Sequence, residues 1–334
     1  MADIKFKEVG QGDSLILIWG DKQDPHMGII DCNIYGSRNP IVDELKILKP
    51  SEIDFVIISH MHADHFSGMP DLFDYCESNN ISIKHFYHTF EIEYLKIFSD
   101  IIVSQRSQKL AERFLLKFQV LTDSMLIKSI DSISNSIKPI ALDNGYSIEF
   151  LSPHGKDYLK FSEHQSRYLS NRTSVLPDFN SLSSICLITN KTKAGLLTAD
   201  VTKKPLRRLI GHVSEEMQFV QVPHHGSIKN HVEKFWDSLD LVKDCPAVLS
   251  VGDVARDRLP NIEVIEYFDK KGFQVESTDF TFGLVDYYHA SPVRSPQLKR
   301  VSASLSSFST LLRTNNSTVS TSLRFKGDKT YSLT

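Results

Sequence analysis

The stretch SHMHADHFSG, residues 59–68, contains three histidines and one aspartate within six positions. It follows the apolar run IDFVII, which is typical of a buried strand. In an extended loop His60 and His62 point to the same side, whereas Asp64 and His65 lie one turn further along. Imidazole and carboxylate ligands suit zinc, iron or manganese, and a mixed set with open positions is typical of a catalytic site. The spacing therefore predicts that two pairs of side chains face two metal ions.

A simpler interpretation of this stretch is a polar loop in which Asp64 caps a helix. Three histidines in so short a segment disfavour it. The same caution applies to His85 and His88 in HFYHTF, which we interpret as core or surface residues rather than ligands.

Length and composition indicate an ordinary globular protein: 334 residues, 41% hydrophobic and 24% charged. The four cysteines form no CxxC pair, which argues against a disulfide framework and a thiolate zinc site. A formal net charge of −3 argues against a protein that coats nucleic acid, although it allows a local phosphate site. The N-terminus lacks a signal-like pattern, and no apolar run approaches the ~20 residues of a membrane helix. We expect a cytoplasmic protein without a membrane partner.

The first elements are three short strands, IKFKEV, DSLILIW and HMGIIDC, separated by turn residues and predicted to form an antiparallel meander. A helix follows, with Asn39 as its cap and Pro40 in its first turn. After residue 180, strand-like and helix-like segments alternate, which predicts mixed sheets covered by helices.

Residues 1–294 are predicted to form one hydrolase domain, and residues 90–140 have the periodicity of a helical insertion. Two roles for the insertion stay open: a cover over the sheet edge, or a lid that shapes substrate access. Residues 295–334 are a Ser/Thr-rich C-terminal extension that ends in a predicted strand.

The HxHxDH pattern after a buried strand resembles the signature of the metallo-β-lactamase fold superfamily, which implies an α/β fold: an αββα sandwich of two facing mixed sheets. A narrower resemblance, to the soluble domain of the ComEC/competence-type group, spans most of the chain outside residues 90–145 and the C-terminal extension. Five further motifs carry it in order: VGQGDSLIL, LLTAD, VPHHGS, AVLSVGD and STDFTFGLV.

The resemblance implies that His60 and His62 hold the first metal ion. One of His224 and His225, in HHGS, would complete that site, and the other would contact the substrate or donate a proton. The residues alone leave open which histidine does which. For this pair, satisfied polar groups at a strand end are the simpler alternative.

The second metal ion would be held by Asp64 and His65, with Asp200 at the end of GLLTAD as the carboxylate that joins both ions. Asp31, at the end of GIIDC, resembles the acid that supports a ligand from behind. Without the resemblance, TAD would be only a strand end.

One position departs from the group's pattern. Leu259, before Pro260, stands where the group carries a Gly-His-Pro histidine, the last ligand of the second metal ion. Because leucine cannot ligate, the second site would be weaker, filled only with substrate, or completed by Asp257, His231 or His289.

Several polar residues are candidates for substrate contacts, with turn capping and loop ordering as the simpler alternatives. They are Asp13, Ser14, Asn180, Ser184 and Ser227. A basic cluster beyond Asp200 is either a solvated helix face or a contact to a phosphate backbone. It consists of Lys203, Lys204, Arg207 and Arg208.

Together these features predict a metal-dependent hydrolase: a phosphodiesterase or nuclease that uses two divalent ions, zinc or manganese, and a metal-activated water on nucleic acid or nucleotides. Asp64, His224 and His225 are the predicted catalytic side chains. Two alternatives stay open: hydrolysis of a lactone, thioester or phosphocholine ester, and a metal-binding regulatory subunit with a degraded second site. Protein partners and the oligomeric state are not predicted.

Overall fold

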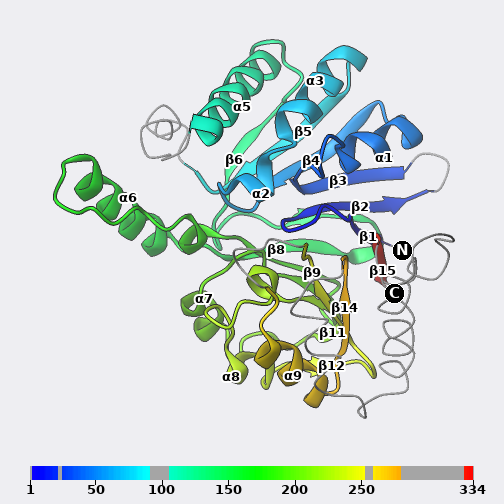
Figure 1. Cartoon of the computed structure of the whole chain (residues 1–334). Coiled ribbons are helices and arrows are strands. Elements are labelled where there is room, and N and C mark those ends of the chain that lie inside the picture. Colours follow the sequence, from blue (N-terminus) through cyan, green and yellow to red (C-terminus); the bar gives the residue numbers. More distant parts are fainter. Residues whose placement is uncertain (1, 22–24, 91–104, 253–258, 280–326, 334) are drawn as a thin grey trace, which may run out of the picture.

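The structure is a computed structural model that describes residues 2–21, 25–90, 105–252, 259–279 and 327–333. Two sheets face each other, with helices on both outer faces (Figure 1). This confirms the predicted αββα sandwich of two mixed sheets. None of the described helices combines the length and apolar character needed to cross a bilayer.

The first sheet has seven strands in the order β15-β1-β2-β3-β4-β5-β6. Their bounds are β1 Ala2–Phe6, β2 Ser14–Gly20, β3 Pro25–Cys32, β4 Glu52–Ile58, β5 Ser82–His88, β6 Ile130–Ser132 and β15 Lys329–Leu333. Strands β1, β2 and β3 are antiparallel, as the predicted meander requires, whereas β3 to β6 are parallel.

The second sheet has the order β14-β13-β11-β10-β9-β8-β7, and β12 pairs with β11. Its strands are β7 Ile140–Ala141, β8 Ser147–Ser152, β9 Ile185–Thr189, β10 Lys193–Leu197, β11 Glu216–Gln221, β12 Asp240–Leu241, β13 Pro246–Leu249 and β14 Gln274–Ser277. Parallel pairing begins between β10 and β11, so the sheet is mixed.

Helices α1 Pro40–Leu48, α3 Met69–Asn79 and α5 Gln105–Asp123 cover the first sheet, and α7 Lys203–Arg208, α8 Glu233–Trp236 and α9 Ile262–Lys270 cover the second (Figure 1). Two other helices are α2 Ala63–Phe66, at the candidate site, and α6 Gly155–Leu169, which extends from the body. The predicted cap of α1 is confirmed, because the Asn39 side chain accepts hydrogen bonds from the backbone amides of Ile41 and Val42.

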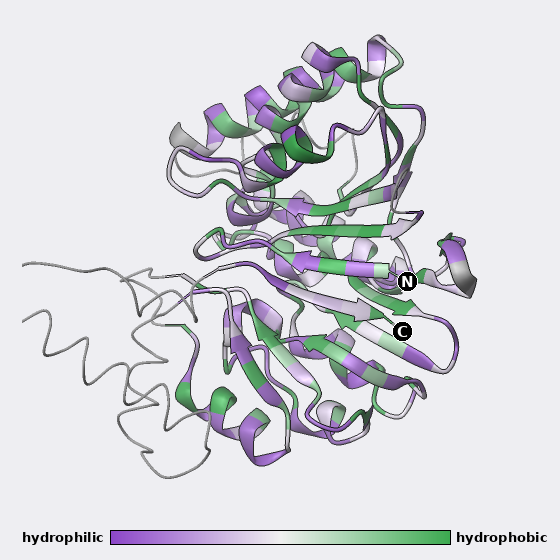
Figure 2. Cartoon of the chain, turned by 90° about the vertical axis from the view of Figure 1, so that its right-hand side faces the viewer, coloured by the Kyte–Doolittle hydropathy of each residue, from purple (hydrophilic) through white to green (hydrophobic). Residues whose placement is uncertain are grey.

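The core has three layers because side chains alternate between the two faces of a strand. In β9, Ile185 and Leu187 pack under the outer helices, whereas Cys186 and Ile188 lie between the sheets. Figure 2 shows the resulting pattern, with hydrophobic strands in the middle and hydrophilic stretches on the outer helices. This close packing fixes the position of one sheet on the other, so the loops at their ends can hold side chains against one another.

The segment predicted as a helical insertion is helical in α5, and it ends in strands β6 and β7 instead of continuing as helix to residue 140. Residues 91–104 lie outside the described part. Buried Phe114 and Phe118 of α5 pack against Phe73 of α3 and Phe86 of β5, so α5 is part of the helical layer on the first sheet.

Candidate metal centre

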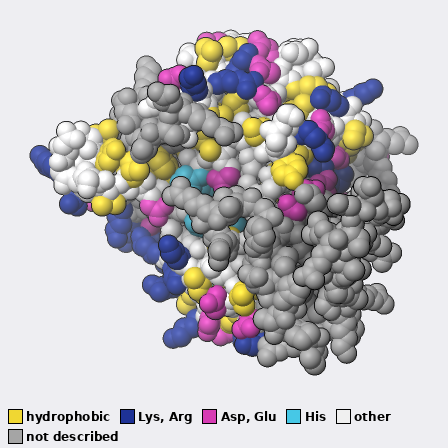
Figure 3. Space-filling model, in the orientation of Figure 1, with side chains coloured by type: hydrophobic (Ala, Val, Ile, Leu, Met, Phe, Trp, Pro, Cys, Tyr) yellow, Lys and Arg dark blue, Asp and Glu magenta, His cyan; other side chains and the backbone are white. Residues whose placement is uncertain are grey.

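Five segments from both sheets bring histidine and aspartate side chains together. Asp31 lies near the end of β3, His60 and His62 follow β4, and α2 carries Asp64 and His65. From the second sheet, Asp200 follows β10, and the 3-10 turn η4 Pro223–Gly226 after β11 carries His224 and His225. Figure 3 shows histidine side chains reaching the surface beside acidic ones. Residues far apart in the chain thus converge at one end of the sandwich.

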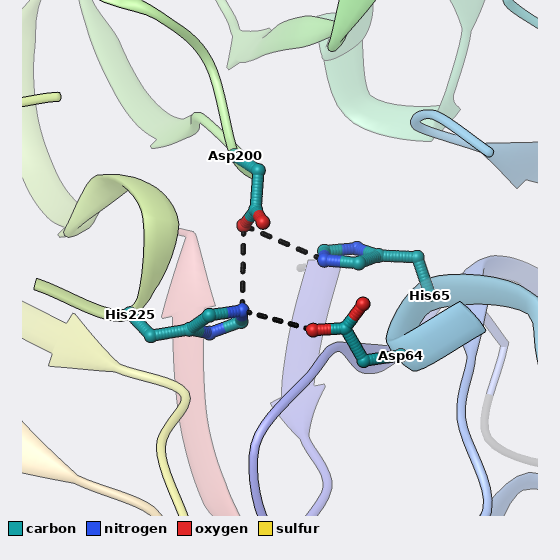
Figure 4. Close-up of side chains that lie close together, drawn as sticks. All are labelled: Asp64, His65, Asp200 and His225. Carbon is teal, nitrogen blue, oxygen red and sulfur yellow. Dashed lines mark ion pairs between the residues drawn. The ribbon is translucent and has the colours of Figure 1, made fainter. Parts of the chain in front are cut away.

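One group consists of Asp64, His65, Asp200 and His225, whose ligand atoms all lie within 4.8 Å of one another. Nε2 of His225 lies 3.4 Å from Oδ2 of Asp64 and 3.5 Å from Oδ1 of Asp200. Nε2 of His65 lies 3.4 Å from that same Asp200 oxygen. Figure 4 shows the four side chains pointing toward a common centre.

A second group consists of His60, His62 and Asp200. Nε2 of His60 lies 3.1 Å from Nδ1 of His62 and 3.8 Å from Oδ2 of Asp200. Nε2 of His224 lies 3.7 Å from this Asp200 oxygen. Asp200 therefore presents one carboxylate oxygen to each group.

The charges of the first group depend on one another. Burial disfavours a charge on His225, but the carboxylates of Asp200 and Asp64 outweigh it and raise its pKa to about 9. Burial likewise opposes a charge on His65, yet Asp200 and Asp31 raise its pKa well above the ordinary value. In contrast, burial and the neighbouring charges of His65 and His62 keep the pKa of His60 low. In the metal-free protein these shifts favour charged His65 and His225 beside the carboxylates and a neutral His60.

The structure distinguishes the two histidines of HHGS. Nδ1 of His225 donates to the backbone carbonyl of Ser250 at 2.6 Å, so Nε2 is the ring atom that faces the acidic group. Nδ1 of His224 accepts from the side-chain amide of Asn180 at 3.3 Å, because an amide nitrogen can only donate. Neutral His224 then carries its proton on Nε2, toward Asp200. His225 thus has the geometry of a ligand and His224 that of a proton donor.

The position of His225 also bears on Leu259, where the sequence lacks the expected histidine ligand. His225 joins Asp64 and His65 as the third side chain around Oδ1 of Asp200, so this group has four candidate ligands without one from position 259. His231 lies elsewhere: it is buried edge-on against Tyr267, with ring centroids 4.5 Å apart, and belongs to neither group. Asp257 and His289 lie outside the described residues.

Asp31 and Ser59 support the histidines from behind. Oδ2 of Asp31 accepts from Nδ1 of His65 at 2.7 Å and from the hydroxyl of Ser59 at 2.6 Å, and Oδ1 accepts from the Ser59 amide. With its hydrogen used on Asp31, the Ser59 oxygen can accept from Nδ1 of His60, 3.2 Å away. Both rings are thereby turned so that their Nε2 atoms point into the centre. The sequence did not single out Ser59, because a serine before a histidine motif has no distinctive spacing.

Gln221 is a second contributor that the sequence did not reveal. Its side-chain oxygen accepts from the amides of Thr198 and Ala199, just before Asp200, and its side-chain nitrogen donates to Asp13 at 2.8 Å. Asp13 in turn lies 3.6 Å from Nδ1 of His65. One glutamine at the end of β11 therefore ties the Asp200 loop to the other half of the centre. The only available signal was its position just before VPHHGS.

The local backbone is held in strained or tight conformations around the centre. Asp31, Ala199, His224 and His225 all have positive φ, between 42° and 58°, which is uncommon for residues with a Cβ. Gly12, with φ of 121°, packs so closely that an added Cβ would lie 2.2 Å from the carbonyl oxygen of Asp64. This close approach explains the glycine of GQGDS.

The predicted substrate contacts have different surroundings. Asp13 is buried behind His65, and buried Ser14 accepts from the Asn33 amide at 2.6 Å. Ser184 and Ser227 are also buried, and the Ser184 amide donates to the Ser59 carbonyl. Two of the five contact the convergent histidines: the Asn180 amide donates to Nδ1 of His224, and Asp13 lies 3.6 Å from Nδ1 of His65. The other residues singled out lie apart: His88 is buried and stacked on Phe90, and His85 is half-exposed.

The donor atoms fit divalent metal ions. Nε2 of His65, Nε2 of His225 and Oδ1 of Asp200 are buried and have no hydrogen-bond partner among the described residues. Leaving such atoms unpaired is costly, so a shared partner is expected where they converge. Nitrogen and carboxylate oxygen donors suit zinc or another transition metal ion. One metal ion held by the group of Asp64, His65, Asp200 and His225 would satisfy all three atoms.

Comparisons with known structures return metallo-β-lactamase-fold proteins among others. The protein YhfI from Bacillus subtilis is 13% identical, with 83% of this chain and 95% of that chain covered and a TM-score of 0.45. Unliganded yeast PDE1 is 10% identical, with 83% and 97% covered and a TM-score of 0.47. Zn²⁺-bound PqqB from Methylobacterium extorquens is 8% identical, with 83% and 98% covered and a TM-score of 0.45. No curated protein sequence matches the chain.

The family comparison concerns the half of the centre that comes from the first sheet. Residues 29–120 match the model of the Metallo-beta-lactamase superfamily, and this range includes Asp31 and the segment from His60 to His65. The narrower relationship to the ComEC-type group stays a prediction. The segment that matches this model thus contributes the histidines and aspartates that meet Asp200 and His225 at one end of the sandwich.

Proposed function

We propose that this protein is a metal-dependent hydrolase that cleaves phosphodiester bonds in nucleic acids or nucleotides. One observation carries the proposal: the two carboxylate oxygens of Asp200 face two separate groups of imidazoles, 3.4–3.5 Å away on one side and 3.7–3.8 Å on the other. A shared carboxylate between two nitrogen-rich groups supports a paired-metal hydrolase.

His60, His62 and Asp200 would hold one ion, and Asp64, His65, Asp200 and His225 the other. When bound, such ions supply an activated water at neutral pH and stabilise charge on the entering and leaving oxygens of an in-line displacement. The chain's own contribution is orientation: Asp31, Ser59 and the Ser250 carbonyl fix the rings before any substrate arrives.

His224 is suited to the departing group. Burial lowers its pKa, so the ring is neutral near pH 7, and Asn180 keeps the ring proton on Nε2. Its side chain is 27% exposed, whereas His60 and His65 are fully buried. A neutral, partly exposed imidazole that carries its proton toward the centre can protonate a leaving alkoxide.

The two alternatives differ from this proposal in what they require. Another ester substrate would use the same centre without a phosphate contact. A regulatory subunit would require a degraded second group, and His225 removes the reason to expect one.

The test compares wild type with Asp200→Asn on bis(p-nitrophenyl) phosphate and on labelled single- and double-stranded DNA. Zinc, manganese and magnesium are each supplied, and bound metal is counted on the same samples. We expect metal-dependent cleavage that the variant loses. Two equivalents of bound metal without phosphodiester cleavage would contradict the proposal and favour another ester.

A further inference from the structure

Helix α7 begins three residues after Asp200, so the Cα of Lys203 lies within about 11 Å of the Cα of Asp200. Its four cations form two rows at a spacing of four residues. Lys204 and Arg208 both donate to Asp157 on α6, at 2.6 Å each for their shortest contacts. Asp157 is only 5% exposed, and this row is therefore committed to joining α7 to α6.

The other row is free. Lys203 and Arg207 have no ion-pair partner among the residues that the structure describes, and Arg207 is exposed. On the first turns of α6, Lys156 and Lys160 are likewise exposed and unpaired within the described segments. The one acid close behind them on α6 is Glu163, which is also exposed. Four cations thus flank the Asp157 junction without neutralisation, in a chain whose net charge is −3.

The positive charge acts on its surroundings. Burial lowers the pKa of His154, at the start of α6, and Arg208, Lys204 and Lys156 lower it further against the opposing charge of Asp157. Figure 3 shows Lys and Arg side chains gathered below α6 on the side of the histidines. Because Asp157 is already paired with Lys204 and Arg208, the free cations leave the junction between α6 and α7 with a net positive charge that favours anions.

Aromatic rings connect this surface to the metal centre. The ring of Phe161 on α6 lies 5.2 Å from that of Phe179, which lies 5.9 Å from the ring of His62. Both phenylalanines are partly exposed. Aromatic rings beside a cationic track are the combination on which single-stranded nucleic acids bind, because bases stack on the rings while phosphates pair with the cations.

We propose that the α6–α7 surface binds the backbone of single-stranded nucleic acid, through Lys203, Arg207, Lys156 and Lys160, and leads the strand past Phe179 into the metal centre. This inference rests on the proposed function and narrows its substrate class. The buried position of the centre selects the single strand: His60, His65, Asp200 and His225 are each at most 2% exposed. A flexible strand can lower a phosphate toward them, whereas a stiff duplex cannot bend over so short a distance.

The test measures binding, which does not depend on turnover. The probe is a labelled phosphorothioate oligothymidylate of about 20 nucleotides, longer than the ~4–16 that a single-strand site covers. It keeps the backbone charge and resists hydrolysis. We expect Lys203→Glu with Arg207→Glu to weaken binding at least about tenfold and to flatten the salt dependence of the affinity by roughly half. Lys156→Glu with Lys160→Glu should act in the same direction.

Two matched variants serve as controls. Lys203→Arg with Arg207→Lys keeps both charges and should retain binding. Lys109→Glu with Lys243→Glu makes the same change in net charge at exposed positions on α5 and after β12, and should also retain it. Circular dichroism melting of each variant verifies the fold.

Each outcome decides the inference. Wild-type affinity in both pairs of Glu variants of the α6–α7 surface, preference for duplex over single strand, or binding confined to vesicles of anionic phospholipid would overturn it. If the oligonucleotide binds as expected but no phosphodiester is cleaved, the surface stands and the proposed function fails. If bis(p-nitrophenyl) phosphate is cleaved without oligonucleotide binding, the proposed function stands and the surface fails.

Discussion

The two ligand groups that share Asp200 differ in how firmly the chain holds them. In the group of Asp64, His65 and His225, both rings are fixed through Nδ1, by Asp31 and by the Ser250 carbonyl. In the other group, the described residues place the Ser59 hydroxyl behind His60 and show no comparable contact behind His62. Oδ1 of Asp200 is surrounded by three candidate ligands, and two of them are held in place through Nδ1. The candidate second metal site is therefore the more preorganised of the two, which is the opposite of what the leucine at position 259 suggests.

We expect the largest effect on metal binding and activity from replacing Asp200, because both groups share its carboxylate. Asp200→Asn should reduce bound metal at both sites and lower phosphodiesterase activity more than about 100-fold, because loss of a mere supporting residue already costs ~10–100-fold. Metal content by mass spectrometry and initial rates measure it. Retention of both ions in the variant would contradict a bridging carboxylate.

The next effect separates the groups. His225→Ala should remove the ion held by Asp64 and His65 and leave the other, so bound metal falls from two equivalents to one. His62→Ala should remove the less supported ion and leave the second group occupied. Titration of each variant with zinc, followed by counting of tightly bound metal, compares them. If His225→Ala keeps both ions, a residue outside the described segments completes the second site.

Asp31→Asn tests the support itself. The amide can still fill the space, but it cannot accept two short hydrogen bonds as a carboxylate, and the His65 ring loses its orientation. We expect metal affinity to fall about 10–100-fold at the second group. The affinity of the group with His60 should fall less, and an equal loss at both would show that Asp31 supports the whole loop.

The smallest effect concerns pH. In the metal-free protein the pKa of His225 is raised to about 9, above the unfolded value near 6.5, and that of His65 is raised as well. A raised pKa stabilises the folded state fully below about pH 6.5, and this stability is lost as pH rises through about 9. Metal binding requires the deprotonated rings, so it becomes more favourable as pH rises.

Thermal melting with and without zinc between about pH 6.5 and 9.5 measures this effect. The metal-free protein should lose on the order of 1–3 kcal/mol across the range, and the zinc-bound protein should not follow it. Parallel curves would show that the histidines are not the protonated partners of Asp64 and Asp200.

The sequence predicted the fold class and the ordered motifs because both depend on local patterns. Alternation in the strands, the Asn39 cap and the HxHxDH spacing are readable over a few residues. The sequence does not reveal which side chains of distant loops contact one another. Assigning His225 required the Ser250 carbonyl, and Gln221 and Ser59 act through contacts between segments that are distant in the chain. The basic cluster divides into a paired and a free row only once Asp157 is placed.

Strand β15 pairs with β1 along its whole length, and Asp328 just before it forms an ion pair with buried Lys7 across 321 positions of sequence. Tyr331 of β15 also stacks on Phe219 and donates to Glu276, so this strand contacts both sheets. During synthesis, β1 therefore emerges from the ribosome long before its neighbour exists, and its outer hydrogen-bonding edge stays open meanwhile. A chain released before residue 329 would keep that edge, which is a template for pairing with another chain.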